Sequence, residues 1–230
     1  MKMESSHAED RKTGSQENRG RRRSASPVFS SVKGNEMSEA GVRLGRDRKK
    51  KLISLYAPAV EFYSRLEGRH TVFDCENGFC LDVLWRKHNF EHLCGVYCDR
   101  PPEVIHAGRL TEAEFFYDAL RKGRLAVDSI HYPDYRKAYG KALVLHEILS
   151  LPIGVEVIVD SDKSSIDYFY GNDHWCLGLD AYHDTNRIDS SFSDGFVHYP
   201  KSVRKQSVSA RRRESGNAYR VLSITIVDNR

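Results

Sequence analysis

Long apolar runs are missing from this sequence. No stretch approaches the roughly 18 consecutive apolar residues that a membrane-spanning helix needs, so no membrane association is expected. The N-terminus is charged from its first residues and shows no apolar signal-peptide segment, which favours a cytoplasmic protein or export by a route without a classical signal. The five cysteines are an odd number, and without a secretory signal we expect reduced thiols rather than a disulfide framework. No internal repeat is visible.

Positive charge is unevenly distributed along the chain. Residues 1–51 contain 14 Lys and Arg against 7 Asp and Glu, whereas residues 52–230 contain 22 against 25. The net charge of +4 therefore comes from the N-terminal segment and conceals a slightly acidic remainder. The pI alone is thus a weak argument for nucleic-acid binding, and the position of each basic cluster matters more.

The first 46 residues lack any helical or strand periodicity. Ser, Gly, Arg and Glu dominate, and this composition cannot bury enough apolar surface to offset the entropy of ordering. We therefore expect a disordered basic tail over residues 1–46, which either stays solvated or attaches weakly to nucleic acid. The remaining residues, 47–230, are expected to form a single domain.

Helical and strand patterns follow one another in an informative order. Apolar spacing predicts three helices, over 52–66, 111–123 and 133–149, although Pro58 should kink or split the first. A capping box, Thr111 to Glu114, opens the second. Alternating patterns predict strands over 79–85, 155–159, 166–170, 174–179, 196–199 and 219–227. Helices first and short strands last indicate an α+β domain, with N-terminal helices packed on an antiparallel sheet of about four to six strands.

The most informative segment is Trp85–Gly95, which reads W-R-K-H-N-F-E-H-L-C-G. It holds two histidines, one lysine and one arginine within seven residues, and His88 and His92 are four apart, so they share a face of a helix. Such a cluster supplies a proton acceptor near neutral pH, a cation for phosphate oxygens and a proton donor. The alternative is that Phe90 and Leu93 fill the core while the charged residues are only solvated.

Metal binding is a second interpretation of the same segment. His88, His92, Cys94 and Cys98 are acceptable zinc ligands, but their spacing is compressed and lacks the two separated pairs of usual structural sites. Asp160-Ser161-Asp162 superficially suggests a cation loop, yet no glutamate-terminated twelve-residue loop follows, so turn chemistry is favoured. We therefore expect neither a metal ligand set nor a cofactor.

A second basic segment, Tyr199–Lys205, comes just before the last expected strand. It combines an aromatic-Pro turn and a hydroxyl with three cations, and no acidic residue occurs from Lys201 to Arg213. The segment either forms a phosphate-binding rim, extended by Arg211–Arg213, or is a mobile loop between strands. Further cations, interpreted as a solvated helix face, are Arg136, Lys137 and Lys141.

From about Leu52 to Val227 the chain resembles the phage and mobile-element proteins grouped as barnase–EndoU–colicin–RelE-like nucleases, and within them the fourth group. Three features carry the resemblance. The specific one is Arg86–Gly95, which follows the pattern R/K-K-x-N-F-x-H-L-x-G. The looser ones are Phe115-Phe116 in a small helix and the late aromatic-Pro-x-Ser turn at Tyr199–Ser202.

The resemblance implies a metal-independent RNase with helices packed on a curved antiparallel sheet, and a role in conflict between mobile elements and their hosts. Carried over residue by residue, it points to His92, Lys87 and Ser202. His88 departs from the pattern, which often has an acidic or polar residue there, so the resemblance does not support a mechanism with paired histidines.

The resulting hypothesis is an endoribonuclease of toxin or mobile-element type that uses the 2′-hydroxyl of its RNA substrate as nucleophile, with a possible antidote or immunity protein as partner. We expect the following site: for catalysis His92, Lys87, Arg86, Ser202 and Arg204, and for substrate binding His88, Tyr199, Lys201 and Lys205. Two alternatives remain, a non-catalytic module that binds RNA or a protein, and a zinc-stabilised interaction domain.

Overall fold

The computed structural model describes residues 39–101, 110–159, 166–182, 196–211 and 217–228. Within them lie four α-helices, namely α1 (Glu39–Leu66), α2 (Lys87–Cys94), α4 (Glu112–Arg121) and α5 (Tyr135–Leu149). The strands are β1 (Arg69–Cys75), β2 (Cys80–Leu84), β3 (Tyr97–Cys98), β4 (Ile130–His131), β5 (Glu156–Val159), β6 (Tyr168–Gly171), β7 (Cys176–Ala181), β8 (Val197–Arg204) and β9 (Ala218–Asp228). Most of the expected tail, residues 1–38, lies outside the described residues, and α1 begins ahead of the expected domain start.

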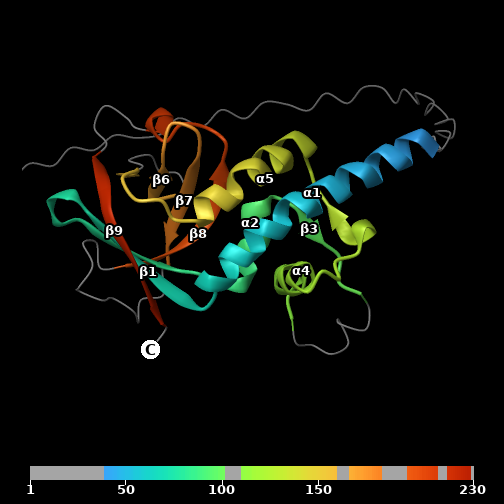
Figure 1. Ribbon diagram of the computed structural model, residues 1–230, viewed down its shortest axis with the longest axis horizontal. Coiled ribbons are helices and arrows are strands. Elements are labelled where there is room, and N and C mark those ends of the chain that lie inside the picture. Colours follow the sequence, from blue (N-terminus) through green and yellow to red (C-terminus); the bar gives the residue numbers. More distant parts are fainter. Residues whose placement is uncertain (1–38, 102–109, 160–165, 183–195, 212–216, 229–230) are drawn as a thin grey trace, which may run out of the picture. The chain divides into compact units, whose positions relative to one another are not determined.

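Seven of these strands form one sheet, in the order β1-β2-β8-β7-β6-β5-β9. The sheet closes on itself because β9 pairs with both β5 and β1, and Figure 1 shows it at one end of the described fold, with the helices at the other. All neighbours are antiparallel except β2 and β8, which are parallel. The remaining two strands, β3 and β4, form a separate small sheet. The α+β class is confirmed.

The sheet differs from the expected one in size and in character. It has seven strands rather than four to six, and its parallel β2–β8 pair makes it mixed rather than wholly antiparallel. The strand that was missed is β1, in which the buried positions include Thr71 and Cys75 beside Phe73, so the apolar alternation is weak in the sequence. Pairing with both β2 and β9 stabilises it instead.

The expected turn at Tyr199–Ser202 is also corrected, because this segment continues β8 as far as Arg204. Pro200 lies where the pairing of β8 with β7 shifts register, between Gly178 and Leu179. A proline inside a strand is usually found at such an irregularity or at an edge. The pairing with β2 reaches only Val197 and His198.

The helices agree more closely with the sequence. In α4 the capping box forms as expected, since the backbone N–H of Glu114 donates to Oγ1 of Thr111 (3.2 Å) and the Glu114 carboxylate accepts from the Thr111 N–H (2.9 Å). In α1 the helix continues through Pro58 without splitting. No helix of the described residues is long and apolar enough to cross a membrane.

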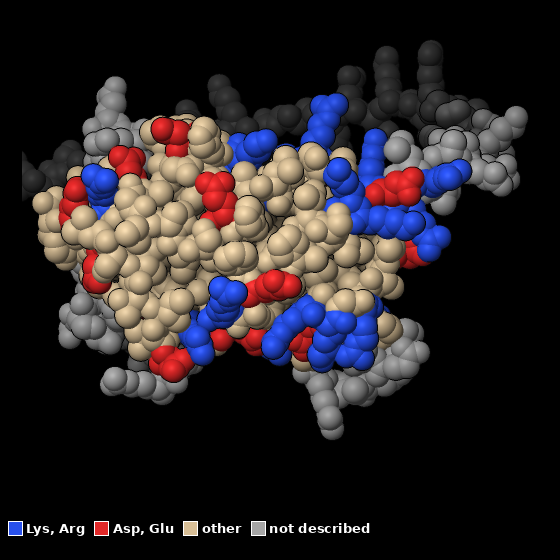
Figure 2. All heavy atoms as spheres, in the orientation of Figure 1, with Lys and Arg blue, Asp and Glu red and all other residues tan. Residues whose placement is uncertain are grey.

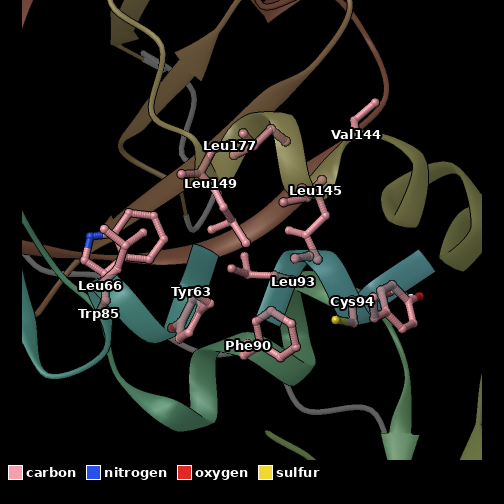
Figure 3. Close-up of a cluster of buried hydrophobic side chains, with 14 of the residues drawn as sticks. Tyr63, Leu66, Trp85, Phe90, Leu93, Cys94, Val144, Leu145, Leu149 and Leu177 are labelled. Carbon is pink, nitrogen blue, oxygen red and sulfur yellow. Dashed lines mark hydrogen bonds between the residues drawn. The ribbon is translucent and has the colours of Figure 1, made fainter. Parts of the chain in front are cut away.

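A continuous core joins the helices to the inner side of the sheet. Figure 3 shows Tyr63 of α1, Phe90 and Leu93 of α2, Leu145 and Leu149 of α5 pointing into it. Their burial excludes water from the space between the three helices and the strands, and each fully buried side chain of this kind contributes roughly 1.5–3 kcal/mol. Helix α2 is therefore held between α4, α5 and β8, and it also contacts α1, where the Tyr56 hydroxyl donates to the backbone oxygen of Cys94.

Candidate active site

The Trp85–Gly95 segment follows β2 directly and contains the whole of α2. Phe90, Leu93 and Cys94 are fully buried, and the Phe90 ring lies 4.9 Å from that of Tyr63 (Figure 3). The side chain of His92 points away from this core and is exposed. Phe90 and Leu93 therefore fill the core, as the second interpretation of the segment expected, whereas His92 is accessible to solvent.

The C-terminal end of α2 holds a lysine from another helix. Nζ of Lys141, in α5, donates a hydrogen bond to the backbone oxygen of His92 (3.0 Å). Gly95 ends α2 with a φ of 70°, and a Cβ atom at this position would lie 2.9 Å from Cδ of Lys141. Glycine is thus favoured at position 95 for two reasons: it adopts the left-handed conformation readily, and it leaves space for the side chain of Lys141.

Lys141 is half-buried, and this burial affects the pKa of its ammonium group. Burial lowers its pKa below the ordinary lysine value, although the neighbouring Cys94 thiol acts in the opposite direction. Among the described residues no carboxylate forms an ion pair with it. A lysine with a lowered pKa at a hollow in the surface is a candidate for proton transfer or for binding an anion.

A groove of about 670 Å³ runs between α5 and the end of β8. Its described lining residues include five cations and no acidic residue, namely Arg136, Lys137, Gly140, Lys141, Ser202, Val203, Arg204, Lys205 and Gln206. Two segments that are more than sixty residues apart in the sequence thus contribute to one basic surface. Lys and Arg side chains also gather over the helical end of the face in Figure 2, near α4 and near the N-terminal part of α1.

A smaller hollow of about 290 Å³ adjoins the groove. It is lined by His92, Gly95, Val96, Tyr97, Pro133, Asp134, Lys137, Ala138 and Lys141. Lys137 and Lys141 line both cavities, so they stand between His92 on one side and the Ser202–Lys205 segment on the other. The structure thereby brings the two segments expected to form the site to the same pair of lysines.

Ser202 and Arg204 occupy successive outward positions near the end of β8. Ser202 is paired with Gly178, its buried Oγ has no hydrogen-bond partner among the described residues, and a Cβ at Gly178 would lie 2.8 Å from that oxygen. The Arg204 guanidinium lies 5.5 Å from the ring centroid of Phe169. Cation–π contact holds the arginine without neutralising its charge.

Arg86, Tyr199 and Lys201 form a second group, outside the groove. The Arg86 guanidinium lies 4.7 Å from the centroid of the Tyr182 ring, which in turn lies 4.7 Å from that of Tyr199. The Tyr199 hydroxyl donates to the buried carboxylate of Asp180 (2.8 Å), which also forms an ion pair with Lys201. Burial and this hydrogen bond raise the pKa of Tyr199 to about 12. Asp180 therefore offsets much of the positive charge expected here.

Lys87 lies at the other end of α2, beside α4. Its Nζ is 3.2 Å from Oδ1 of Asp118 and 3.6 Å from Oε1 of Glu67. Burial alone would lower the pKa of Lys87, but the two carboxylates together raise it. Lys87 is not among the residues that line either cavity. Its neighbour His88 is half-buried, and burial together with the charge of Arg86 lowers the pKa of that imidazole.

The four residues considered as zinc ligands do not form a metal site. Cys94 and Cys98 are buried whereas His92 is exposed, and no group of three or more His, Cys, Asp or Glu placed to hold a metal ion occurs in the described part of the chain. Asp160–Asp162 and Arg212–Arg213 lie outside the described residues.

The residues that sequence reasoning did not assign to the site are in α5 and β3. Arg136, Lys137 and Lys141 were expected to be a solvated helix face, and Tyr97 was not considered. The available signal was the spacing of Lys137 and Lys141, which are four apart and so lie on one face of the helix. The sequence alone could not show that α2 and β8 contact that face.

A family model described as phage-Barnase-EndoU-ColicinE5/D-RelE like nuclease4 matches residues 58–224. The chain belongs to this family. The match extends from the middle of α1 into β9, so it contains both cavities and every residue expected to form the site. Membership of the family identifies the domain as a nuclease of the barnase, EndoU, colicin and RelE type. No curated protein and no solved structure gives a significant match.

Proposed function

We propose that this chain is an endoribonuclease that cleaves RNA through attack of a 2′-hydroxyl on the adjacent phosphorus, without a metal ion. The observation that carries the proposal is the position of two lysines. Lys137 and Lys141 line both the basic groove, which has no acidic residue in its described lining, and the hollow that contains the exposed His92. The family supports a nuclease, and the charge of the groove matches a phosphate backbone.

Two proton transfers are needed in this reaction. The bond from the 2′-oxygen to phosphorus forms as the bond from phosphorus to the 5′-oxygen breaks; a base takes the 2′-hydroxyl proton and an acid gives one to the departing 5′-oxygen. We assign one transfer to His92 and the other to Lys141, whose lowered pKa suits it to release a proton. Arg204 and Lys205 stabilise the charge of the phosphorane. Ser202 lines the same groove, but its Oγ is buried, so we give it no role in the reaction.

A reaction without metal fits the composition of the lining. Magnesium sites in nucleases use carboxylates, but the described groove lining has none. In the adjoining hollow the acidic lining residue is Asp134, whose Oδ1 caps α5 by accepting from the N–H groups of Arg136 (2.8 Å) and Lys137 (3.3 Å). Cations and an imidazole are sufficient for attack by an internal 2′-hydroxyl.

The other expected residues receive different roles in this proposal. Lys87 fastens α2 to α4 through its two carboxylates rather than acting on phosphate. Lys201 and Tyr199 hold Asp180. Arg86 is exposed and stacked on Tyr182, so it remains a binding residue for a more distant part of the RNA.

Cleavage of a 5′-labelled mixed RNA in the presence of EDTA tests the proposal. We expect fragments that end in 2′,3′-cyclic phosphate, no cleavage of the same sequence made as DNA, and cleavage by His92→Ala that is at least about 100-fold slower. His174→Ala, which changes an exposed histidine in the turn between β6 and β7, serves as the control. Intact RNA, or equal cleavage by His92→Ala, would contradict the proposal. Salt-sensitive binding without scission would identify a non-catalytic RNA-binding module instead.

The toxin role is part of the same proposal. An RNase with an open basic groove is harmful to the cell that makes it unless a partner covers the groove, and an acidic antidote protein has the complementary charge. We expect expression of the chain to arrest bacterial growth and His92→Ala to relieve the arrest. Equal arrest by both forms would separate the toxicity from cleavage.

A further inference from the structure

The hollow beside His92 differs in chemistry from the groove. The groove offers cations and a hydroxyl, whereas the hollow adds Tyr97 from β3, together with Pro133 and Asp134 at the start of α5. An aromatic ring and a proline ring suit a flat apolar ligand, and a carboxylate repels phosphate. The sugar–phosphate backbone therefore fits the groove better than it fits the hollow.

Tyr97 is unusually accessible for an aromatic residue. Its relative exposure is 59%, the second highest of the large hydrophobic residues that are exposed in the described part of the chain. It is held in place by β3, where it pairs with His131 of β4. Directly opposite residues of an antiparallel pair lie on one face, so the phenol and the imidazole stand side by side. His131 is itself fixed, because its Nε2 lies 2.7 Å from Oδ2 of Asp99.

The hollow is also adjacent to groups that bind phosphate and move protons. Lys137 and Lys141 line it from α5, and His92 lines it from α2. A ligand with a planar ring and an attached phosphate would place the ring against Tyr97 and the phosphate against the two lysines. A nucleotide within an RNA strand has this combination.

We propose that this hollow is a nucleobase subsite, in which one base of the RNA stacks on Tyr97 and the phosphate attached to its nucleotide contacts Lys137 and Lys141. This inference rests on the proposed endoribonuclease function and extends it, because it assigns the base that flanks the cleaved phosphate to a defined place. Asp134 faces the same hollow, and its Oδ2 accepts no hydrogen bond from the described residues, so it is able to accept one from an N–H group on the edge of the base.

Binding of short 2′-O-methyl RNA, which cannot be cleaved by its own 2′-oxygen, tests the subsite independently of catalysis. We compare an oligonucleotide carrying all its bases with a series in which each position in turn is abasic, measuring the dissociation constant by fluorescence anisotropy. For the wild type, one abasic position should weaken binding about tenfold, the usual size of a base–aromatic stacking effect. Tyr97→Ala should weaken binding of the complete oligonucleotide by the same factor, and should be insensitive to loss of that one base.

Tyr97→Phe and Leu222→Ala are the matched variants. Phenylalanine keeps the stacking ring and should bind like the wild type, while Leu222 on β9 is exposed to nearly the same degree, 56%, and lies outside both cavities, so its removal should change nothing. Equal binding by Tyr97→Ala and wild type, or additive losses from the variant and the abasic position, would overturn the subsite.

Cleavage of ordinary RNA by the same proteins distinguishes the two proposals. If the wild type cleaves RNA but no single abasic position weakens its binding to the oligonucleotide, the subsite is refuted and the nuclease function stands. A wild type that shows the Tyr97-dependent position but never cleaves would support the subsite and refute the nuclease function. A wild type that neither binds the oligonucleotide nor cleaves ordinary RNA would refute both.

Discussion

Lys87 and Lys141 lie at opposite ends of α2, and their surroundings are opposite as well. Lys87 opens the helix and is flanked by the carboxylates of Glu67 and Asp118. Lys141 reaches the other end from α5 and contacts a backbone carbonyl, that of His92. The carbonyl end of a helix attracts a cation through partial charges and leaves most of its charge available to an anionic ligand. Thus two lysines that are equivalent in a count of charges differ in their capacity to bind phosphate.

The largest expected effect is the difference in cleavage rate between two variants, in which either Lys141 or Lys87 is replaced by methionine. Lys141→Met should reduce RNA cleavage about 100- to 1000-fold, because it removes the group that we assign to one of the two proton transfers. Lys87→Met should change cleavage by less than about threefold, because its charge is already offset by two carboxylates. Initial cleavage rates of the two variants, with circular dichroism to confirm folding, measure the contrast. Similar losses in both would show that the comparison is wrong.

Glu91 lies between the two ends of α2 and is a buried acidic residue without an ion pair in the described part of the chain. Its effect on the free energy of unfolding can be measured as a function of pH. It is 5% exposed, and burial raises its pKa to about 7 from 4.5, since the N–H of Cys98 and the charge of Glu112 are smaller influences. An unfolded chain ionises this group at lower pH, so the free energy of unfolding should fall as pH rises from 4.5 to about 7 and stay low above it.

Glu91→Gln should therefore stabilise the protein at pH 8 by about 2 kcal/mol and have little stabilising effect at pH 4. Urea denaturation at the two values measures the difference. Glu61→Gln, at an exposed position in α1 and not among the groups that affect Glu91, is the control and should show no such dependence on pH. A stability change in Glu91→Gln that is the same at both values would contradict the assignment of its pKa.

Gly95 tests whether the position of Lys141 matters as much as its charge. Gly95→Ala should lower the free energy of unfolding by about 1–2 kcal/mol, because its φ is left-handed, and should slow cleavage about tenfold by displacing Lys141. Gly68→Ala has a similar φ of 74° but no atom within 4 Å of the new Cβ. It should lose stability and keep its cleavage rate. Equal cleavage rates in the two variants would show that the contact with Lys141 is not required.

The smallest expected effect is a pH dependence of RNA binding. Because burial lowers the pKa of Lys141, its ammonium loses its proton at lower pH than an ordinary lysine does. Affinity for non-cleavable RNA should therefore weaken about threefold in the wild type before the pH reaches 10.5, the ordinary lysine value. In Lys141→Arg the guanidinium stays charged, so anisotropy titrations should show a flatter profile. Parallel profiles would exclude Lys141 as the titrating group.

Local features of this chain were predictable from its sequence, and features that depend on distant segments were not. The capping box of α4 and the buried Phe90 and Leu93 follow from spacing and polarity within a few residues. Strand β1 was missed because its identity depends on pairing with β9, about 150 residues later. Tyr199–Ser202 was taken for a turn because proline suggests one, whereas the pairing of β8 with β7 keeps it in a strand.

The candidate site shows the same division. The spacing of residues in the Arg86–Gly95 segment and the run of cations after Lys201 marked both sides of it, since each is a local cluster. The charge of Lys87 was not expected to be offset, because Glu67, in the turn after α1, and Asp118, in α4, come from other parts of the chain. Lys141 could not be chosen from the cations of α5, because its contact with the end of α2 spans 49 residues.

Chemical labelling of the lysines is the most direct test of the central claim, that the groove between α5 and β8 holds the RNA. The chain is treated briefly with acetic anhydride, with and without non-cleavable 2′-O-methyl RNA, and acetylation at each lysine is read by mass spectrometry. We predict that RNA protects Lys137, Lys141 and Lys205, while Lys87 and Lys201 are acetylated to the same extent in both samples. Protection of Lys87 and Lys201 without protection of the three groove lysines would contradict the account.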